Sequence, residues 1–346
     1  MSDRSEALSV CVAGLGVMGN YHLRVVDSLP RVELVAVVEP DSERRSRALG
    51  LYPRTLSFAT LEEALQATQV DIVCCAAPAH QLARLAEPAI EAGTAVLLEK
   101  PMAASADDAR RIVDLAAAHG TFLSVGYVER FNPALKACKD RIARSDLGRI
   151  FQVRSRRLSP FPDRMSSAGV ALDLASHDLD AMHFLLDSEI DRAYAETQQL
   201  AHDHAEDLVT ATLRFKSGAT GALEANWLTP RKVRELTVTG EAGAFTVDCL
   251  TQRLVLHERP VSDVNWGTLE LLRGPREGNR IDYALERWEP LRGEWEAFVS
   301  ALVAGEPPPV RGEDGLHALV AAEALQLSGR THEPVRVGEM QVGPKP

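Results

Sequence analysis

The stretch LSVCVAGLGVMGNYHLRVVDSL, residues 8–29, decides the fold of the first part of this 346-residue chain. An apolar run typical of a buried strand enters the turn GLGVMG (14–19), and a helical pattern follows it. In such a turn the first glycine bends the chain off the strand, the second leaves room for a pyrophosphate, and the third lets the helix pack on the sheet. The helix N-terminus adds free N–H groups and partial positive charge. We therefore predict phosphate contacts from Gly14, Gly16, Val17, Met18 and Gly19; the alternative is a glycine-rich turn that binds no nucleotide.

The second apolar strand, VELVAVVEP (32–40), carries an acid near its end. Glu39 lies twenty residues after Gly19. A carboxylate there can accept hydrogen bonds from both ribose hydroxyls and would repel a 2′-phosphate, which favours NAD over NADP. Arg44 and Arg45 follow closely in the sequence, and their positive charges instead favour NADP.

The pattern of elements predicts two domains of an α/β protein. Strands alternate with helices up to about residue 126, which predicts a doubly wound parallel sheet, the Rossmann arrangement. From residue 127 onward, short alternating strands predict an open, mainly antiparallel sheet with one face that is solvated or covered by a partner. The expected divisions are residues 1–126, residues 127–335 and a loose tail at 336–346.

The composition excludes several classes of function. A hydrophobic content of 45% and a charged content of 25% are typical of a globular protein, and the net charge of −11 disfavours a general nucleic-acid or anionic-membrane binder. The first residues do not resemble a signal peptide, and no apolar run is long enough to span a membrane. Five cysteines without a CxxC spacing indicate buried thiols in a reducing cytoplasm.

The tripeptide Glu99-Lys100-Pro101 follows an inner strand of the predicted parallel sheet. Ligands of such sheets bind beyond the carboxyl ends of the strands. A lysine at this position is costly unless it is paired or touches a ligand, and Pro101 biases its backbone toward an extended conformation. A lysine that extends to solvent is an equal alternative.

Asp173, His177 and Asp180 are spaced i, i+4 and i+7 within a predicted helix. On an α-helix this spacing places all three side chains on one face. A histidine beside a carboxylate can act as a general base. A salt-bridged helix with a satisfied histidine is the alternative that spacing alone favours.

Two further polar clusters have less specific patterns. Arg156, Arg157 and Arg164 flank a proline-rich loop and could clamp a phosphate or carboxylate, or could equally be solvated charges. The segment His202-Asp203-His204 with Glu206 and Asp207 contains metal-ligand residue types, but a solvated loop is the favoured interpretation, and no metal is predicted.

Taken together, these motifs resemble the Gfo/Idh/MocA oxidoreductases. The resemblance rests on GLGVMG (14–19), Glu99-Lys100-Pro101, GYVERFNP (126–133) and the Asp173/His177/Asp180 pattern, which occur in the expected order. It implies a Rossmann domain, a C-terminal α/β domain whose sheet forms subunit contacts in a homodimer or homotetramer, and an active site between the domains. Lys100, Asp173 and His177 would face the nicotinamide of NAD. The resemblance also assigns cofactor contacts to Pro78 and Glu99, and substrate contacts to Tyr127, Arg130, Asn132, Arg156, Arg164, Asp173 and His177.

A narrower branch also resembles this chain. The amino-acid sequence around residues 160–180 and 227–240 is similar to that of bacterial UDP-N-acetylglucosamine 3-dehydrogenases, which oxidise the 3-hydroxyl of the sugar. One position departs from the family: a histidine is common four residues after the proline of the third-strand turn, and here Leu82 takes that place. The contacts of this loop with the cofactor are therefore in doubt.

The sequence thus leads to an expected function with two alternatives. Hydride would pass from a sugar secondary hydroxyl carbon to NAD, with His177 as base, Asp173 orienting it, and Lys100 holding the oxygen. Lys100 as the base is chemically possible too. Another polyol such as an inositol or a free sugar is the first alternative substrate, and a non-catalytic, NAD-sensing regulator is the second alternative.

Overall fold

The computed structural model describes residues 7–162, 168–201, 204–260 and 278–340, in two compact units. The first unit contains residues up to Val128 together with residues 289–320, and the second contains residues 129–288 and the described residues after 320. The division after Val128 falls close to the expected one. The return of residues 289–320 to the first unit differs from the expectation that 127–335 form one domain.

The first unit is built on a six-stranded sheet in which every pairing is parallel. The spatial order is β3-β2-β1-β4-β5-β6, so the order reverses between β1 and β4, where open α/β sheets bind ligands. This confirms the predicted doubly wound sheet. Its strands are β1 (Leu8–Ala13), β2 (Val32–Val38), β3 (Leu56–Phe58), β4 (Ile72–Cys75), β5 (Ala95–Leu98) and β6 (Leu123–Val125).

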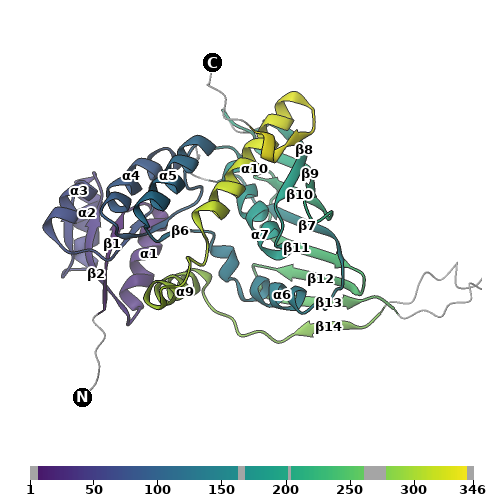
Figure 1. The fold of residues 1–346 in the computed structure, drawn as a ribbon, viewed down its shortest axis with the longest axis horizontal. Helices are drawn as coiled ribbons and strands as arrows, with labels where there is room; N and C mark the ends of the chain where they lie inside the picture. Colours follow the sequence, from purple (N-terminus) through teal and green to yellow (C-terminus); the bar gives the residue numbers. More distant parts are fainter. Residues whose placement is uncertain (1–6, 163–167, 202–203, 261–277, 341–346) are drawn as a thin grey trace, which may run out of the picture. The chain divides into compact units, whose positions relative to one another are not determined.

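Helices follow the strands of this sheet (Figure 1). Local sequence sets their ends: Asp41 caps α2, Thr60 and Glu63 form a capping box on α3, and Ser105 caps α5, which stops at Gly120 with a φ of 63°. The short strand β3 and helix α2 were not predicted. The helices of the first unit are α1 (Val17–Ser28), α2 (Ser42–Leu51), α3 (Leu61–Ala67), α4 (Ala79–Glu91), α5 (Ala106–His119) and α9 (Pro290–Ala304).

Helix α9 belongs to the first unit because its aromatic side chains complete that unit's core. Trp295 and Phe298 are fully buried and join the hydrophobic cluster of β1, β2 and α1. Phe298 also meets Phe122 edge to face at a centroid distance of 5.1 Å. Burial of two large aromatic side chains gives this helix a strong hydrophobic reason to pack there.

The second unit is built on a nine-stranded sheet in the order β14-β13-β12-β11-β7-β10-β9-β8-β15. All neighbours pair antiparallel except β7 and β10, which are parallel. This agrees with the predicted mainly antiparallel sheet. The strands are β7 (Ile150–Leu158), β8 (Ile190–Gln198), β9 (Leu208–Phe215), β10 (Thr220–Asn226), β11 (Val233–Gly240), β12 (Gly243–Asp248), β13 (Arg253–Glu258), β14 (Arg280–Tyr283) and β15 (Val335–Arg336).

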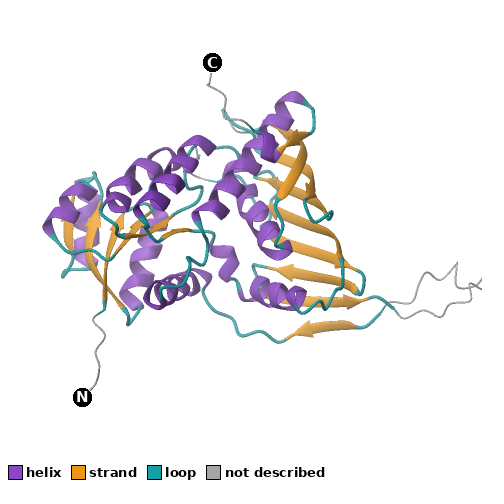
Figure 2. Ribbon diagram, in the orientation of Figure 1, coloured by secondary structure: helices purple, strands orange, loops and turns teal. Residues whose placement is uncertain are grey.

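Helices α6 (Pro133–Ala143) and α7 (Ser176–Leu186) lie on one face of this sheet, as Figure 2 shows. A π-helical segment, η2 (Ala171–Ala175), leads directly into α7, and α10 (Gly312–Thr331) runs from the first unit into the second. The described part of the expected tail forms regular structure: Arg336 belongs to β15, which pairs with β8, and the one-turn helix η3 (Val337–Glu339) follows. Within the described residues, no helix is both long and apolar enough to cross a membrane.

Candidate active site

The three glycines of the phosphate turn differ in the space that surrounds them. Gly14 has a φ of 98°, and a Cβ there would lie 2.5 Å from the carbonyl oxygen of Ala76. A Cβ on Gly19 would lie 1.9 Å from the carbonyl oxygen of Gly14. At Gly16, by contrast, a Cβ would meet no atom within 4 Å. The backbone therefore excludes side chains at Gly14 and Gly19, while Gly16 borders open space at the start of α1.

The N-terminus of α1 is not occupied by a side-chain cap. Its N-cap residue, Gly16, makes no side-chain hydrogen bond, and the first turn holds no acidic residue. Asn20 turns back and donates to the carbonyls of Leu15 and Gly16 at 3.0 and 2.7 Å. The first-turn residues Val17 and Met18 thus present backbone N–H groups that suit a phosphate.

Glu39 lies at the carboxyl end of β2, beside the phosphate turn. Its carboxylate accepts hydrogen bonds from the backbone N–H groups of Leu15 and Asp41, at 2.9 and 3.2 Å. Arg44 lies 3.7 Å from the same carboxylate, and Arg45 donates to the Glu39 carbonyl. The turn, the uncapped N-terminus of α1 and this carboxylate together fit a dinucleotide that lacks a 2′-phosphate.

We expect Glu39→Ala to reduce the preference of the protein for NAD over NADP. Loss of the carboxylate removes the ribose acceptor and the repulsion of a 2′-phosphate, and it frees Arg44 to approach one. Charged hydrogen bonds contribute about 1.5–3 kcal/mol each, so the Kd for NAD should rise roughly ten- to a hundredfold. Titrations of both dinucleotides measure this, with the exposed Glu43→Ala as control. An unchanged ratio of the two Kd values would show that Glu39 does not select the cofactor.

Glu99 and Lys100 follow β5, as predicted from the sequence. Glu99 is buried, and its Oε2 accepts the backbone N–H of Lys100 at 3.0 Å, while Lys100 itself is partly exposed. The other oxygen, Oε1, lies 2.8 Å from Nε2 of His22 on α1. His22 in turn meets Nε1 of Trp295 on α9 at 2.9 Å. His22 and Trp295 were not predicted from the sequence. Their hydrogen bonds connect α1 and α9 to Glu99, the neighbour of the catalytic candidate Lys100.

A second buried acid, Glu294, lies in the same part of the first unit. It is 1% exposed, and neither of its carboxyl oxygens has a hydrogen-bond partner within the described part of the chain. Burial, and then the nearby charge of Glu99, raise the pKa of Glu294 well above its usual value of 4.5. The shift favours the neutral carboxylic acid over the carboxylate at Glu294.

This neutral acid leads to a prediction about the pH dependence of stability. Above pH 4.5 the unfolded chain loses the proton of Glu294 while the folded protein keeps it, so the free energy of unfolding falls as the pH rises. Glu294→Gln removes this loss and should gain stability relative to the parent by up to about 1.4 kcal/mol per pH unit until the folded pKa is reached. Denaturant unfolding at several pH values measures the difference. A difference that is constant with pH would contradict a neutral Glu294.

The loop after β4 contains the position at which the sequence departs from the family. Pro78 caps the start of α4 next to Ala76, whose carbonyl abuts Gly14. Leu82 is 1% exposed within the core, and His80 lies on the surface beside Gln81. Leu82 therefore serves packing, and Pro78 is the residue of this loop that stays a predicted cofactor contact.

In the second unit, Asp173 lies in the π-helical segment η2 and His177 in the first turn of α7. Asp173 thus lies in a π-turn, whose hydrogen bonds run from i to i+5, while His177 and Asp180 both lie in the α-helix. That all three side chains share one face stays a prediction. Asp173 and His177 are both half-buried, whereas Asp180 is buried. Single π-turns are frequent at functional sites, and the catalytic role of this segment stays a prediction.

Buried ion pairs fix this segment to its sheet. Asp178, the neighbour of His177, accepts from Nε of Arg157 at 2.5 Å and from the hydroxyl of Ser155. Arg157 also contacts Glu129 at 3.2 Å. Glu206 accepts the N–H of Ala171 at 3.1 Å at the start of η2. These contacts hold both ends of the segment that carries Asp173 and His177.

Several predicted substrate contacts have other roles in the structure. Arg130 is buried against Asp180, with nitrogen–oxygen distances of 2.6 and 2.9 Å. Asn132 caps α6 and donates to the carbonyl of Cys249 at 2.9 Å, with 2% of its surface exposed. Both polar groups are engaged within the second unit, and their contact with a substrate stays a prediction. Tyr127 is buried in the first unit and stays a prediction.

Arg156 also has partners within the second unit, and its substrate contact stays a prediction; Arg164 lies outside the described residues. Along β7 the side chains alternate: Arg157 faces the buried side with α7, and Arg156 faces the opposite side. Arg156 there pairs with Glu224 at 3.1 Å and Glu235 at 3.8 Å. The sheet itself separates Arg156 from Asp173 and His177.

The acidic segment considered as a metal site has structural roles where it is described. His202 and Asp203 lie outside the described residues, Glu206 supports η2, and Asp207 accepts the backbone N–H of Leu200 at 2.9 Å. In the described ranges, no group of three or more His, Cys, Asp or Glu side chains is arranged to hold a metal ion.

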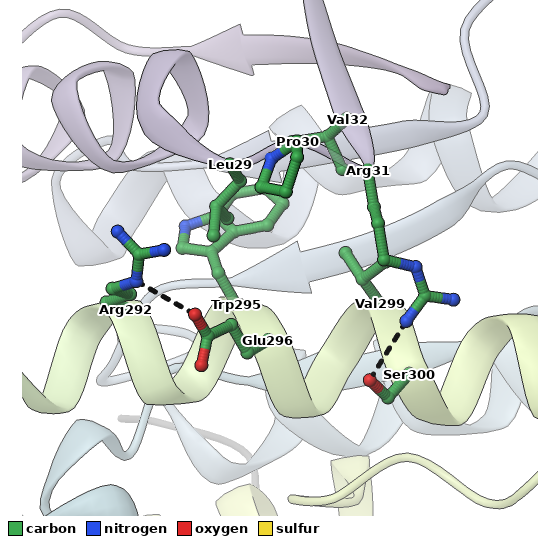
Figure 3. A pocket seen from close by; sticks show the side chains of 9 residues that line it. All are labelled: Leu29, Pro30, Arg31, Val32, Arg292, Trp295, Glu296, Val299 and Ser300. Carbon is green, nitrogen blue, oxygen red and sulfur yellow. Dashed lines mark hydrogen bonds and ion pairs between the residues drawn. The ribbon is translucent and has the colours of Figure 1, made fainter. Parts of the chain in front are cut away.

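A cavity of about 310 Å³ lies on the first unit, away from the predicted site residues (Figure 3). In its wall, Arg292 pairs with Glu296 at 2.8 Å and Arg31 donates to Ser300 at 3.3 Å. The lining residues are Leu29, Pro30, Arg31, Val32, Arg292, Trp295, Glu296, Val299 and Ser300.

The phosphate turn, Glu39 and the lysine at the end of β5 define an NAD-binding oxidoreductase of the Rossmann class. Residues 8–127 match the family model described as oxidoreductase family, NAD-binding Rossmann fold, and residues 135–246 match the GFO/IDH/MocA C-terminal domain. The chain belongs to the Gfo/Idh/MocA family of oxidoreductases.

Named relatives include dehydrogenases of two kinds of substrate. The chain is 25% identical to a myo-inositol 2-dehydrogenase from Thermotoga maritima, over 96% of this chain and 99% of the relative. It is 26% identical to a UDP-N-acetylglucosamine 3-dehydrogenase from Acidithiobacillus ferrooxidans, over 92% and 96%. A crystal structure of the enzyme of that name from the same organism superposes with a TM-score of 0.83, at 23% identity and 94% and 98% coverage. GenD2 from gentamicin A biosynthesis, solved with NAD, is 26% identical with a TM-score of 0.81 over 97% of both chains.

Proposed function

We propose that this enzyme oxidises a secondary hydroxyl of a sugar, with the 3-hydroxyl of a UDP-N-acetylhexosamine as the favoured substrate. The observation that carries the proposal is the near full-length similarity to the UDP-N-acetylglucosamine 3-dehydrogenase, which extends the resemblance around residues 160–180 and 227–240. The similarity to the inositol dehydrogenase, equally long, supports a cyclic polyol as the second candidate.

The proposed reaction uses one lysine and one histidine on the same hydroxyl group. The phosphate turn (14–19) and Glu39 would hold NAD, which would supply the hydride acceptor of the reaction. His177 removes the hydroxyl proton as the C–H bond breaks, and Asp173 orients the imidazole and stabilises its positive charge. Lys100 holds the oxygen and stabilises the developing alkoxide until the carbonyl forms. The products are a ketone, NADH and one proton, which His177 passes to water.

Lys100 and His177 could also exchange roles. Lys100 could accept the hydroxyl proton while His177 donates a hydrogen bond to the oxygen. Both assignments require the same two residues, so they share the expectation that loss of either one stops turnover.

A substrate panel tests the proposal. The purified chain with NAD is offered UDP-N-acetylglucosamine, its galacto isomer, free N-acetylglucosamine and myo-inositol, and NADH formation is followed. The proposal expects the highest kcat/KM with a UDP-sugar, by at least about tenfold, the free-energy equivalent of 1.4 kcal/mol. Preference for myo-inositol would establish the second candidate. NAD binding without NADH formation from any of these would favour a sensing role.

We extend the proposal to assembly and compartment. The outer face of the nine-stranded sheet, which carries Arg156, Thr210 and Thr212, is the proposed contact surface of a homodimer or homotetramer. All five cysteines are buried free thiols, which supports function in a reducing cytoplasm. Sedimentation would give the oligomeric state, and a monomer at micromolar concentration would contradict the assembly.

A further inference from the structure

A chain of three buried side chains connects α9 to the backbone of Lys100. Trp295 on α9 and His22 on α1 are fully buried, and Glu99 at the end of β5 is 5% exposed. The links are Trp295 Nε1 to His22 Nδ1 at 2.9 Å and His22 Nε2 to Glu99 Oε1 at 2.8 Å. The last link runs from the Lys100 N–H to Glu99 Oε2 at 3.0 Å.

The first link fixes the protonation of the histidine. An indole nitrogen can only donate, so Nδ1 of His22 must accept and carries no proton. The proton of the neutral ring therefore lies on Nε2, which donates to Glu99. The carboxyl group of Glu99 thus receives two donated hydrogen bonds, one from His22 and one from the Lys100 backbone.

The surroundings leave Glu99 little freedom to move. A Cβ on Gly126 would lie 3.3 Å from both Cα and Cδ of Glu99, so this glycine admits the carboxyl group closely. Glu294 is buried nearby, and its raised pKa favours a neutral acid, which carries no negative charge to repel Glu99. His22, the Lys100 backbone N–H and Gly126 therefore surround the carboxyl group of Glu99. Through that N–H, Glu99 in turn fixes the backbone of Lys100, on which the proposed chemistry depends.

We propose that Trp295, His22 and Glu99 form a positioning relay that sets the backbone of Lys100 for reaction, with His22 as the neutral Nε2–H tautomer. The relay rests on the proposed function, in which Lys100 holds the reacting oxygen. In this proposal α9, which lies some 270 residues after α1 in the sequence, helps to position Lys100. Trp295, His22 and Glu99 are positioning residues, because they act through Lys100.

The tautomer is read directly by nitrogen NMR of the full-length protein with labelled histidine. The His22 signal is identified by its loss in His22→Gln. We expect one ring nitrogen with the shift of an unprotonated acceptor and one with the shift of an N–H group, with the proton coupled to Nε2. In Trp295→Phe the acceptor shift should move, because its donor is gone. An imidazolium, or a proton on Nδ1, would overturn the relay whether or not the enzyme turns over any sugar.

Kinetics test the positioning role on the substrate that the panel identifies. Trp295→Phe and His22→Leu should lower kcat about tenfold or more while the Kd for NAD changes less than about threefold. His22→Gln, which keeps a donor toward Glu99, should recover most of the loss relative to His22→Leu. A role in packing alone predicts the reverse order, since leucine suits a buried site better than an amide.

A neighbouring variant serves as the control. Phe298→Leu disturbs the same core on the same helix without removing a polar group, so it should lower stability and leave kcat within about twofold. Equal losses of kcat in Phe298→Leu and Trp295→Phe would overturn the relay. An inactive parent enzyme would count against the proposed function alone, because the NMR result is independent of turnover.

Discussion

Replacing Lys100 with Met, or His177 with Ala, is expected to lower kcat by about a hundred- to ten-thousandfold, the range of general acid–base and oxyanion contributions. Each variant removes a group that acts as the hydroxyl loses its proton and hydride. NAD binding should persist within about threefold, because the phosphate turn and Glu39 remain. Single-turnover kinetics and dinucleotide titration measure the two effects separately.

An exposed lysine of the second unit provides the matched control. Lys216 pairs with Glu189 on the surface, and Lys216→Met removes the same charge far along the chain from the proposed machinery. It should retain the parent's kcat and stability, since exposed ion pairs contribute little. Near-normal turnover in either the Lys100 or the His177 variant would exclude that residue from the chemistry.

The second large effect is expected at Gly19, where the helix of the phosphate turn meets the turn itself. A glycine-to-alanine change inside a helix ordinarily stabilises by about 1 kcal/mol. At Gly19 the new methyl would lie 1.9 Å from a backbone oxygen, which cannot move aside as a side chain would. We therefore expect a loss of about 1–3 kcal/mol of stability and severe loss of NAD binding.

Substitutions at two other glycines distinguish an effect on packing from an effect on phosphate binding. Gly50 lies in α2 with nothing within 4 Å of a Cβ, so Gly50→Ala should be neutral or stabilising. Gly16→Ala also meets no protein atom, yet its methyl would enter the space proposed for the pyrophosphate. It should keep the parent's thermal stability and bind NAD at least about tenfold more weakly. A stabilised Gly19→Ala would contradict the close approach described for the turn.

Much of the first unit could be predicted because its signals are local. The strand, turn and helix around Gly14 to Gly19 specify their own geometry, and the alternation that follows determines a parallel sheet. The short strand β3 was missed because three residues carry too little periodicity to stand out. Helix α9 was assigned to the wrong unit, since its pattern shows an apolar face but not which core that face completes.

The site was harder to predict because its supports come from distant segments. His22 lies on the buried face of α1 with Gly19, Leu23 and Val26, and a histidine within such an apolar face was the available signal. Its partner Trp295 lies 273 residues away, which no local pattern reveals. For Arg156, strict alternation along β7 could have separated it from Arg157, and the clustering of arginines obscured that pattern.

The central claim is that hydride leaves a sugar hydroxyl carbon for NAD. The direct measurement uses UDP-N-acetylglucosamine with deuterium at C3, incubated with the enzyme and NAD, followed by mass and NMR analysis of both products. The account predicts deuterium at C4 of the reduced nicotinamide, a 3-keto sugar, and abolition of both in Lys100→Met. NADH formed without deuterium, or no NADH from this sugar, myo-inositol or any other alcohol of the panel, would contradict it.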